Sequence, residues 1–163
     1  MPSPFKKISA LATAALALGI CASTLEARRP ADLPSGAIQV PAGTGTWSAA
    51  APSLPPGSQI MVLEGDPSNE GPFTIRLKMP AGASLAPHWH PRDERVTVMS
   101  GELLVGFGDR IDEGAMARFT AGGFYVNPAK SHHYVQAAAE SVLQLTGVGP
   151  WEVHFLEAPT PPR

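Results

Sequence analysis

From Gln59 onward, the chain is a succession of short segments in which apolar and polar residues alternate or a few apolar residues stand together. The segments read QIMVL, FTIRLKM, SLAPHWH, RVTVMS, ELLVGFG, ARFTA, GFYVN, HHYVQ, SVLQLTG and WEVHFL. Stretches such as EGDPSNEGP, PAGA and NPAK separate them. Short strands punctuated by Gly, Pro and Asn turns are typical of an all-β sandwich or small barrel. We predict such a domain over residues 59–157, followed by a tail over residues 158–163.

The alternation also predicts which side chains face the interior, because residues two apart in a strand point to the same face of a sheet. The apolar positions expected to form the core are Phe73, Ile75, Leu77, Leu103, Val105 and Phe107. A helical turn is expected only within GDRIDEGAM. The chain shows neither βαβ alternation nor a long-period repeat.

The N-terminus follows a different pattern. Lys6 and Lys7 precede an uncharged, mostly apolar run from Ile8 to Ile20, and small residues come next. This order is that of a secretory signal peptide, and the run is shorter than the roughly 20 apolar residues that a membrane span needs. We predict a signal peptide over residues 1–27, cleaved near residues 22–27, and a periplasmic or secreted protein.

The single cysteine, Cys21, lies within this predicted signal. Its removal would leave a protein without thiols or disulfides, so thiol catalysis and thiolate metal sites are not expected. An alternative is a lipoprotein anchored through Cys21, because LGIC faintly resembles a lipoprotein signal.

Residues 28–58 are rich in Pro, Gly, Ala and Ser, as an extended arm would be. One short strand is expected at Ala37–Val40. The apolar residues that would pack onto the domain or onto a neighbouring subunit are Ile38, Val40, Trp47 and Leu54.

Composition narrows the class of protein further. A length of 163 residues corresponds to one domain. The net charge of −2 provides no basic surface for nucleic acid. The counts of 18 Pro and 16 Gly fit a turn-rich β protein.

The segment PHWHPRDERVTVMSGE carries the candidate chemistry. His88 and His90 point to one face of a strand, and Glu94 heads an alternation that continues into the apolar interior. Two neutral imidazoles and a carboxylate form a site for a divalent transition metal. A buried carboxylate without a partner would be costly, and a bound cation removes that cost.

A fourth ligand is expected from another strand, and NPAKSHHYVQ offers His132 and His133. His133 shares the apolar face of Val135, whereas His132 lies on a more polar face. We therefore favour His133, with His132 and a water molecule as alternatives. His154 is expected at the surface or at a sheet edge.

These residues fall into two motifs that resemble those of the cupin superfamily, and the resemblance extends over about residues 59–156. The first motif comprises Gly82, His88, His90, Glu94 and Gly101, and the second comprises Gly122, Pro128 and His133. The second motif departs from the family pattern, which has Gly where this chain has Lys130 and often Asn where it has Ala137. The chain is most similar to small exported single-domain cupins.

The resemblance implies a cupin-type antiparallel β-barrel of two packed sheets, often dimeric. It also implies one divalent transition metal near a mouth of the barrel. The implied ligands are His88, His90, Glu94 and His133. Iron, manganese, nickel, copper and zinc all occur in the family, so the metal is not specified.

Three classes of function remain open for such a site. The first is a dioxygenase acting on a small enolisable or catechol-like molecule. The second is a non-redox isomerase or lyase, and the third is a small-molecule binding or sensing protein without turnover. Lys130 is a candidate substrate-binding residue at the pocket mouth, and a solvated turn lysine is the alternative.

Overall fold

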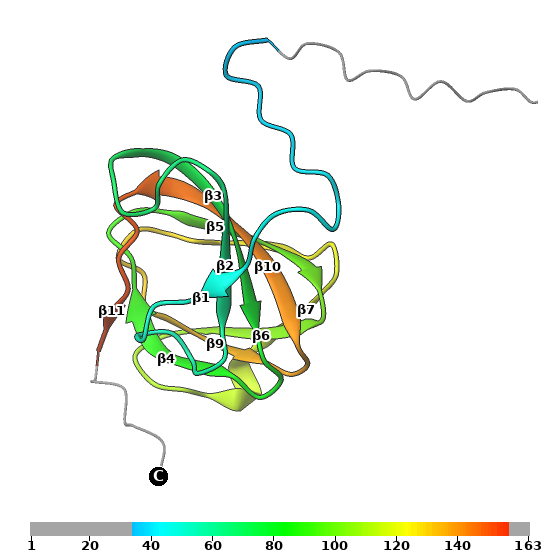
Figure 1. Cartoon of the computed structure of the whole chain (residues 1–163). Coiled ribbons are helices and arrows are strands. Elements are labelled where there is room, and N and C mark those ends of the chain that lie inside the picture. Colours follow the sequence, from blue (N-terminus) through cyan, green and yellow to red (C-terminus); the bar gives the residue numbers. More distant parts are fainter. Residues whose placement is uncertain (1–33, 157–163) are drawn as a thin grey trace, which may run out of the picture. The chain divides into compact units, whose positions relative to one another are not determined.

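The computed structural model describes residues 34–156, which form mainly β-strands (Figure 1). Contacts divide the chain into residues 1–37 and residues 38–163. Of the first unit only residues 34–37 are described, and they form a turn that the hydrogen bond from Ala37 N to Pro34 O closes at 3.0 Å. The predicted signal peptide, Cys21 and the predicted tail lie outside the described residues.

The second unit consists of two antiparallel sheets, which confirms the all-β prediction. The six-stranded sheet has the order β1 (Ser48–Ala49), β2 (Gln59–Glu64), β3 (Gly71–Met79), β10 (Ser141–Gly149), β5 (Glu94–Ser100) and β8 (Phe124–Asn127). The five-stranded sheet has the order β11 (His154–Phe155), β4 (Ser84–Trp89), β9 (His133–Ala137), β6 (Glu102–Phe107) and β7 (Ala117–Thr120). Within residues 34–156, no helix has the length and apolarity needed to cross a bilayer.

The predicted alternation accounts for the core between the sheets. In β3 the buried side chains Phe73, Ile75 and Leu77 alternate with less buried polar ones. The core cluster comprises Leu54, Phe73, Ile75, Leu77, Met79, Leu85, Val96, Val98, Leu103, Val105, Val135, Ala137, Leu143 and Leu145. The prediction was wrong for Phe107, the last residue of β6, which is 52% exposed.

The chain crosses between the sheets twice in the region of the first motif. Residues 90–93 connect β4 to β5, and Gly101 connects β5 to β6. Gly101 has φ +82°, and a Cβ there would overlap with the backbone at Glu140 and Ser141. Glycine is therefore required at this turn for both its conformation and its size. The first motif consequently contributes side chains to the interior from both sheets.

The predicted strand at Ala37–Val40 is wrong, since these residues are irregular. Their prolyl and glycyl neighbours leave a short apolar stretch without a pairing strand. Instead, Ser48–Ala49 pairs with β2, and Leu54, which follows it, is buried in the core. The apolar positions of this region thus differ in role, because Ile38 is exposed whereas Trp47 lies under the Lys78 ammonium at 4.6 Å.

The C-terminal strap, defined here as residues 150–155, folds back along the five-stranded sheet. Only His154–Phe155 of the predicted strand WEVHFL pairs, with Trp89 and His88 of β4. The rest of the strap has no regular secondary structure. This irregular course turns Trp151 toward the interior, where its ring lies 6.3 Å from that of Phe73.

Candidate metal centre

Three histidines from the five-stranded sheet converge inside the barrel. His88 near the end of β4 is the register partner of His133 at the start of β9, and His90 follows β4 directly. One ring nitrogen from each lies within 4.8 Å of the other two, and all three side chains are buried. The ring centroids of His88 and His133 are 4.1 Å apart. The prediction that residues 88, 90 and 133 come together is thus met by the geometry.

The backbone around the site fixes the tautomer of each imidazole. The Nδ1 atoms lie close to backbone carbonyls, at 2.7 Å from Ala86 O for His88, 2.7 Å from Glu152 O for His90 and 3.1 Å from Ser131 O for His133. A carbonyl oxygen only accepts hydrogen bonds, so each Nδ1 carries a proton and donates it. The Nε2 lone pairs are then free to coordinate, which is the arrangement common among metal-bound histidines.

Glu94 reaches the same interior from the six-stranded sheet. Its Oε1 accepts a hydrogen bond from Trp151 Nε1 at 2.9 Å, and its Oε2 accepts one from Asn127 Nδ2 at 2.8 Å. Its Oε2 lies 3.5 Å from His90 Nε2. The carboxylate is not part of the group whose ligand atoms lie within 4.8 Å of one another. The structure therefore places Glu94 beside the triad, and its role as the fourth ligand stays a prediction.

The environment moves the pKa values of these groups apart. Burial, helped by the neighbouring His133, lowers the pKa of His88 to about 3, and burial also lowers the pKa of His133. For His90, burial acts downward, but Glu94 and the Glu152 carbonyl outweigh it and raise the pKa. Burial would raise the pKa of Glu94, yet the contacts with His90 and Asn127 lower it to about 2. At neutral pH the site therefore holds one carboxylate beside imidazoles of which His88 and His133 are neutral.

These shifts predict that the metal-free protein loses stability as the pH falls below 6.5. In that range the unfolded chain protonates residue 88, whereas the folded protein resists protonation until pH is about 3. Because the unfolded chain binds one more proton at residue 88 than the folded protein, the unfolding free energy falls by up to about 1.4 kcal/mol for each pH unit. The raised pKa of His90 has the opposite effect, a loss of stability as the pH rises, and this effect is confined to pH values above 6.5. The measurement is urea unfolding of chelator-treated protein at several pH values below 6.5. His88→Asn should make the unfolding free energy depend less steeply on pH, and an unchanged dependence would contradict the prediction.

The other predicted residues lie outside the triad. His132 is half-exposed and its Nδ1 contacts Asp109 Oδ1 at 2.6 Å, so His133 rather than His132 faces the interior. His154 stacks on Trp89 with centroids 4.2 Å apart, on β11 at the sheet edge. Its predicted edge position is therefore what the structure shows.

Lys130 occupies an exposed turn beside His90. Its φ of +60° is the left-handed conformation that glycine adopts most easily, so the turn expected of the second motif forms despite the substitution. Its backbone N–H donates to His90 O at 2.8 Å. The side chain is not among the described residues that line the interior cavity. A role in substrate binding stays a prediction.

Three functional-site residues were not predicted from the sequence. Asn127 and Tyr125 face inward because β8 pairs with β5 in the register Glu94↔Asn127 and Val96↔Tyr125. The alternation Tyr125, Asn127 in GFYVN was the available signal, but it needed the strand pairing to be interpreted. Trp151 had no sequence signal, since the irregular strap positions it. Its ring stacks on that of His90 with centroids 5.6 Å apart.

The interior cavity beside the triad measures about 30 Å³. A water molecule needs at least about 10–15 Å³, so the cavity holds no more than about two water-sized groups. Most of its lining is apolar, and the polar groups are the three histidines, Glu94, Tyr125 and Trp151. The small interior cavity therefore fits an ion and its smallest ligands, but no organic molecule in this conformation.

The residues present fit a divalent metal ion. The Nε2 atoms of His90 and His133 are buried and make no hydrogen bond among the described residues, although Glu94 Oε2 lies 3.5 Å from His90 Nε2. A buried polar atom without a partner costs free energy unless it is satisfied. A cation bound by the triad would satisfy both lone pairs at once.

Two packed antiparallel sheets with a buried histidine triad near one end define this protein as a cupin. Residues 38–152 match the ChrR cupin-like domain family. The match includes most of the chain, so the protein belongs to this family. The comparison with curated proteins gives no match to this sequence.

Solved structures support the fold. The polyketide cyclase RemF from Streptomyces resistomycificus has a TM-score of 0.61 at 12% identity, over 73% of this chain and 84% of the cyclase. A putative acetylacetone dioxygenase from Methylibium petroleiphilum PM1 has a TM-score of 0.56 at 20% identity, over 69% and 76%. An RmlC-like cupin from Shewanella frigidimarina NCIMB 400 has a TM-score of 0.53 at 17% identity, over 67% and 87%. At these identities the likeness shows the fold alone.

Proposed function

We propose that this protein is a metal-dependent cupin that binds a small bidentate anion at the histidine triad and oxidises it with dioxygen. The observation that carries the proposal is the convergence of three Nδ1-protonated histidines whose Nε2 lone pairs share one buried space. Three ligands leave coordination positions open, as in catalytic rather than structural metal sites.

His88, His90 and His133 would hold the ion, with Glu94 as the fourth ligand or as a charged neighbour. This donor set accepts iron, manganese, nickel, copper or zinc. When bound, a redox-active ion would supply a site for dioxygen and for the chelating substrate. The outer contacts from Ala86, Glu152 and Ser131 orient the three rings and keep the correct nitrogen available.

The charge of the site favours a monoanionic ligand. Glu94 is ionised at neutral pH because its pKa is lowered to about 2. A divalent ion next to one carboxylate and neutral imidazoles leaves one net positive charge in a low-dielectric interior. An enolate or a singly ionised catechol neutralises that charge, and its two oxygens match two open coordination positions.

Tyr125 would help to orient such an anion. Its ring lines the interior cavity, and burial together with the charge of Glu94 raises the pKa of its hydroxyl well above 10. The hydroxyl therefore stays protonated at neutral pH and is a hydrogen-bond donor. A phenol beside an anionic ligand would stabilise it without transferring its proton.

The test is dioxygen consumption by protein loaded with Fe(II) under anaerobic conditions and then mixed with pentane-2,4-dione or a catechol. Uptake that depends on both the substrate and the intact triad is expected. The control is His88→Ala loaded in the same way, which should show only the background rate. A fully loaded protein that consumes no dioxygen with any compound of a broad panel would overturn the proposal.

A second candidate is binding or sensing without turnover, which the closed interior favours. A cavity of about 30 Å³ excludes organic molecules unless the protein opens. Under this alternative, the loaded protein would bind chelating anions or exchange its metal while consuming no dioxygen. The same experiment, followed by titration of the loaded protein with the panel, separates the two.

A further inference from the structure

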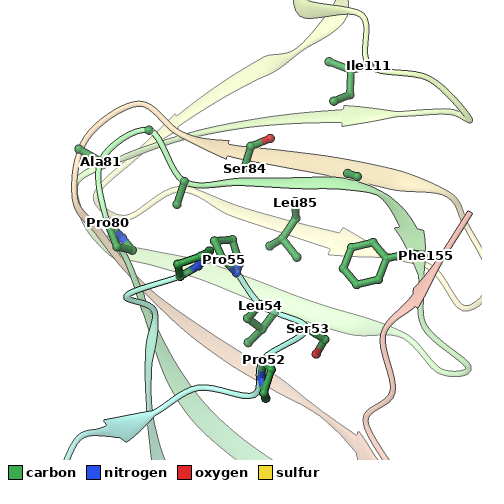
Figure 2. Close-up of a pocket in the computed structure, with 14 residues that line it drawn as sticks. Pro52, Ser53, Leu54, Pro55, Pro80, Ala81, Ser84, Leu85, Ile111 and Phe155 are labelled. Atoms are coloured by element: carbon green, nitrogen blue, oxygen red, sulfur yellow. The ribbon is translucent and has the colours of Figure 1, made fainter. Parts of the chain in front are cut away.

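A groove on the outside of the barrel lies next to the small interior cavity. It measures about 790 Å³, and its main apolar lining residues are Pro52, Leu54, Pro55, Leu85, Ile111 and Phe155 (Figure 2). Sites for small molecules typically measure about 300–1,000 Å³, so the groove has the size that the interior lacks. None of the described residues that line it carries a charge. The groove therefore suits a neutral, largely apolar molecule.

Only a thin layer of side chains separates the groove from the triad. Leu54 and Leu85 line both the groove and the interior cavity. Phe155, which also lines the groove, has its ring centroid 5.5 Å from that of His88. Figure 2 shows Leu54, Leu85 and Phe155 projecting toward one another from three separate segments. Withdrawal of one side chain of this layer would join the two spaces.

Leu54 is the member of this layer that lies outside the paired strands. Leu85 belongs to β4 and Phe155 to β11, which pair with neighbouring strands. Leu54 lies in an irregular loop, residues 51–57, whose base the hydrogen bond from Ala50 N to Ser58 O closes. Within the loop, the Leu54 N–H donates a local hydrogen bond to Ala51 O. The prolines of the loop have no N–H with which to join a sheet.

We propose that Leu54 is the gate between an apolar substrate groove and the metal centre. The gate loop, residues 51–57, lifts Leu54 out of the core, and the groove then becomes continuous with the space around His88. A substrate with an apolar body and a bidentate oxygen head would place its body in the groove and its head at the triad. This substrate class rests on the proposed function, whereas the opening of the loop does not.

The gate is tested in metal-free full-length protein by the rate at which diethyl pyrocarbonate modifies the interior histidines. Trypsin releases residues 79–92, a peptide whose histidines are His88 and His90 alone. His154 provides a half-exposed reference in the same molecule, and fragment-ion masses distinguish it from His132 and His133 in the shared peptide of residues 131–163. If the open form is a minor state of about 10% or less, Leu54→Ala should raise the interior rate relative to His154 by roughly tenfold or more. Leu54→Phe should lower it.

The matched control is Leu103→Ala, because Leu103 is fully buried but lines neither the groove nor the interior cavity. Circular dichroism checks that each variant is folded. An unchanged relative rate in Leu54→Ala, or an equal increase in Leu103→Ala, would overturn the gate. Should Leu54→Ala not fold, a rate in Leu54→Phe that equals that of the unmodified protein would overturn it as well.

A second arm separates the gate from the proposed function. Cobalt(II)-loaded protein is mixed with 1-phenylbutane-1,3-dione, a dione with a bidentate oxygen head and an apolar body, and binding is followed in the visible spectrum. Faster association in Leu54→Ala than in the unmodified protein supports both inferences. A clear effect of Leu54→Ala on histidine modification, without any binding of the dione, would support the gate and contradict the substrate class.

Discussion

Replacement of His88 or of His133 by alanine is expected to weaken metal binding by more than about 100-fold, since loss of outer-shell partners alone commonly costs 10–100-fold. Each substitution removes one of the three imidazoles that converge in the barrel interior. The measurement is the metal content after dialysis, together with competition titration against a chromophoric chelator.

The matched control for the triad is His132→Ala. This histidine neighbours His133 in sequence but contacts Asp109 at the surface. It should bind metal as the unmodified protein does. If His133→Ala retained the metal and His132→Ala lost it, the ligand would be His132 rather than His133. Retention of the metal by both His88→Ala and His133→Ala would contradict the proposed metal site.

The second large effect is expected at Gly106, where β6 passes close to Tyr134 of β9. A Cβ on Gly106 would overlap with the ring carbons of Tyr134, which is 1% exposed and held by hydrogen bonds between its hydroxyl and the backbone of Asp112. Overpacking of a core typically costs about 1–3 kcal/mol, so Gly106→Ala should lower the unfolding free energy by that amount or more. Urea unfolding measures it.

The control for this effect is Gly114→Ala, at an exposed glycine where an added methyl meets only the Asp112 carboxylate. It should leave stability nearly unchanged. Addition of Tyr134→Leu to Gly106→Ala should recover part of the loss, because the ring that causes the overlap is gone. Equal losses in the Gly106 variant with and without Tyr134 would show that the contact is not the cause. Since Phe107↔His133 is the adjacent register pair, the Gly106 variant should also bind metal less tightly.

The histidine part of the site was predictable from the sequence because it depends on local periodicity. His88 and His90 are two apart, and the choice of His133 over His132 followed from the apolar face it shares with Val135. Each inference needed only the fact that side chains alternate across a strand. The structure places all three side chains as this reasoning required.

The contacts around Glu94 were not predictable because they join distant parts of the chain. Trp151 is 57 residues from Glu94, and Asn127 is 33 residues from it. The Asn127 contact depends on the pairing of β8 with β5, without which the alternation of Tyr125 and Asn127 could not be interpreted. The Trp151 contact depends on the course of an irregular segment, which leaves no periodic pattern in the sequence. Leu54 was recognised as an apolar residue of an arm, but its position between groove and interior depends on tertiary packing alone.

The C-terminal strap gives the metal centre a place in the order of biosynthesis. The carbonyl of Glu152 fixes the His90 ring, the indole of Trp151 holds Glu94, and Phe155 packs beside His88. A ribosome makes these residues after every strand that carries a histidine of the triad. The nascent chain therefore lacks a complete coordination environment until the strap has also been made. An ion that needs the complete site is accordingly bound only after that point, and the compartment in which folding ends determines which ion is available.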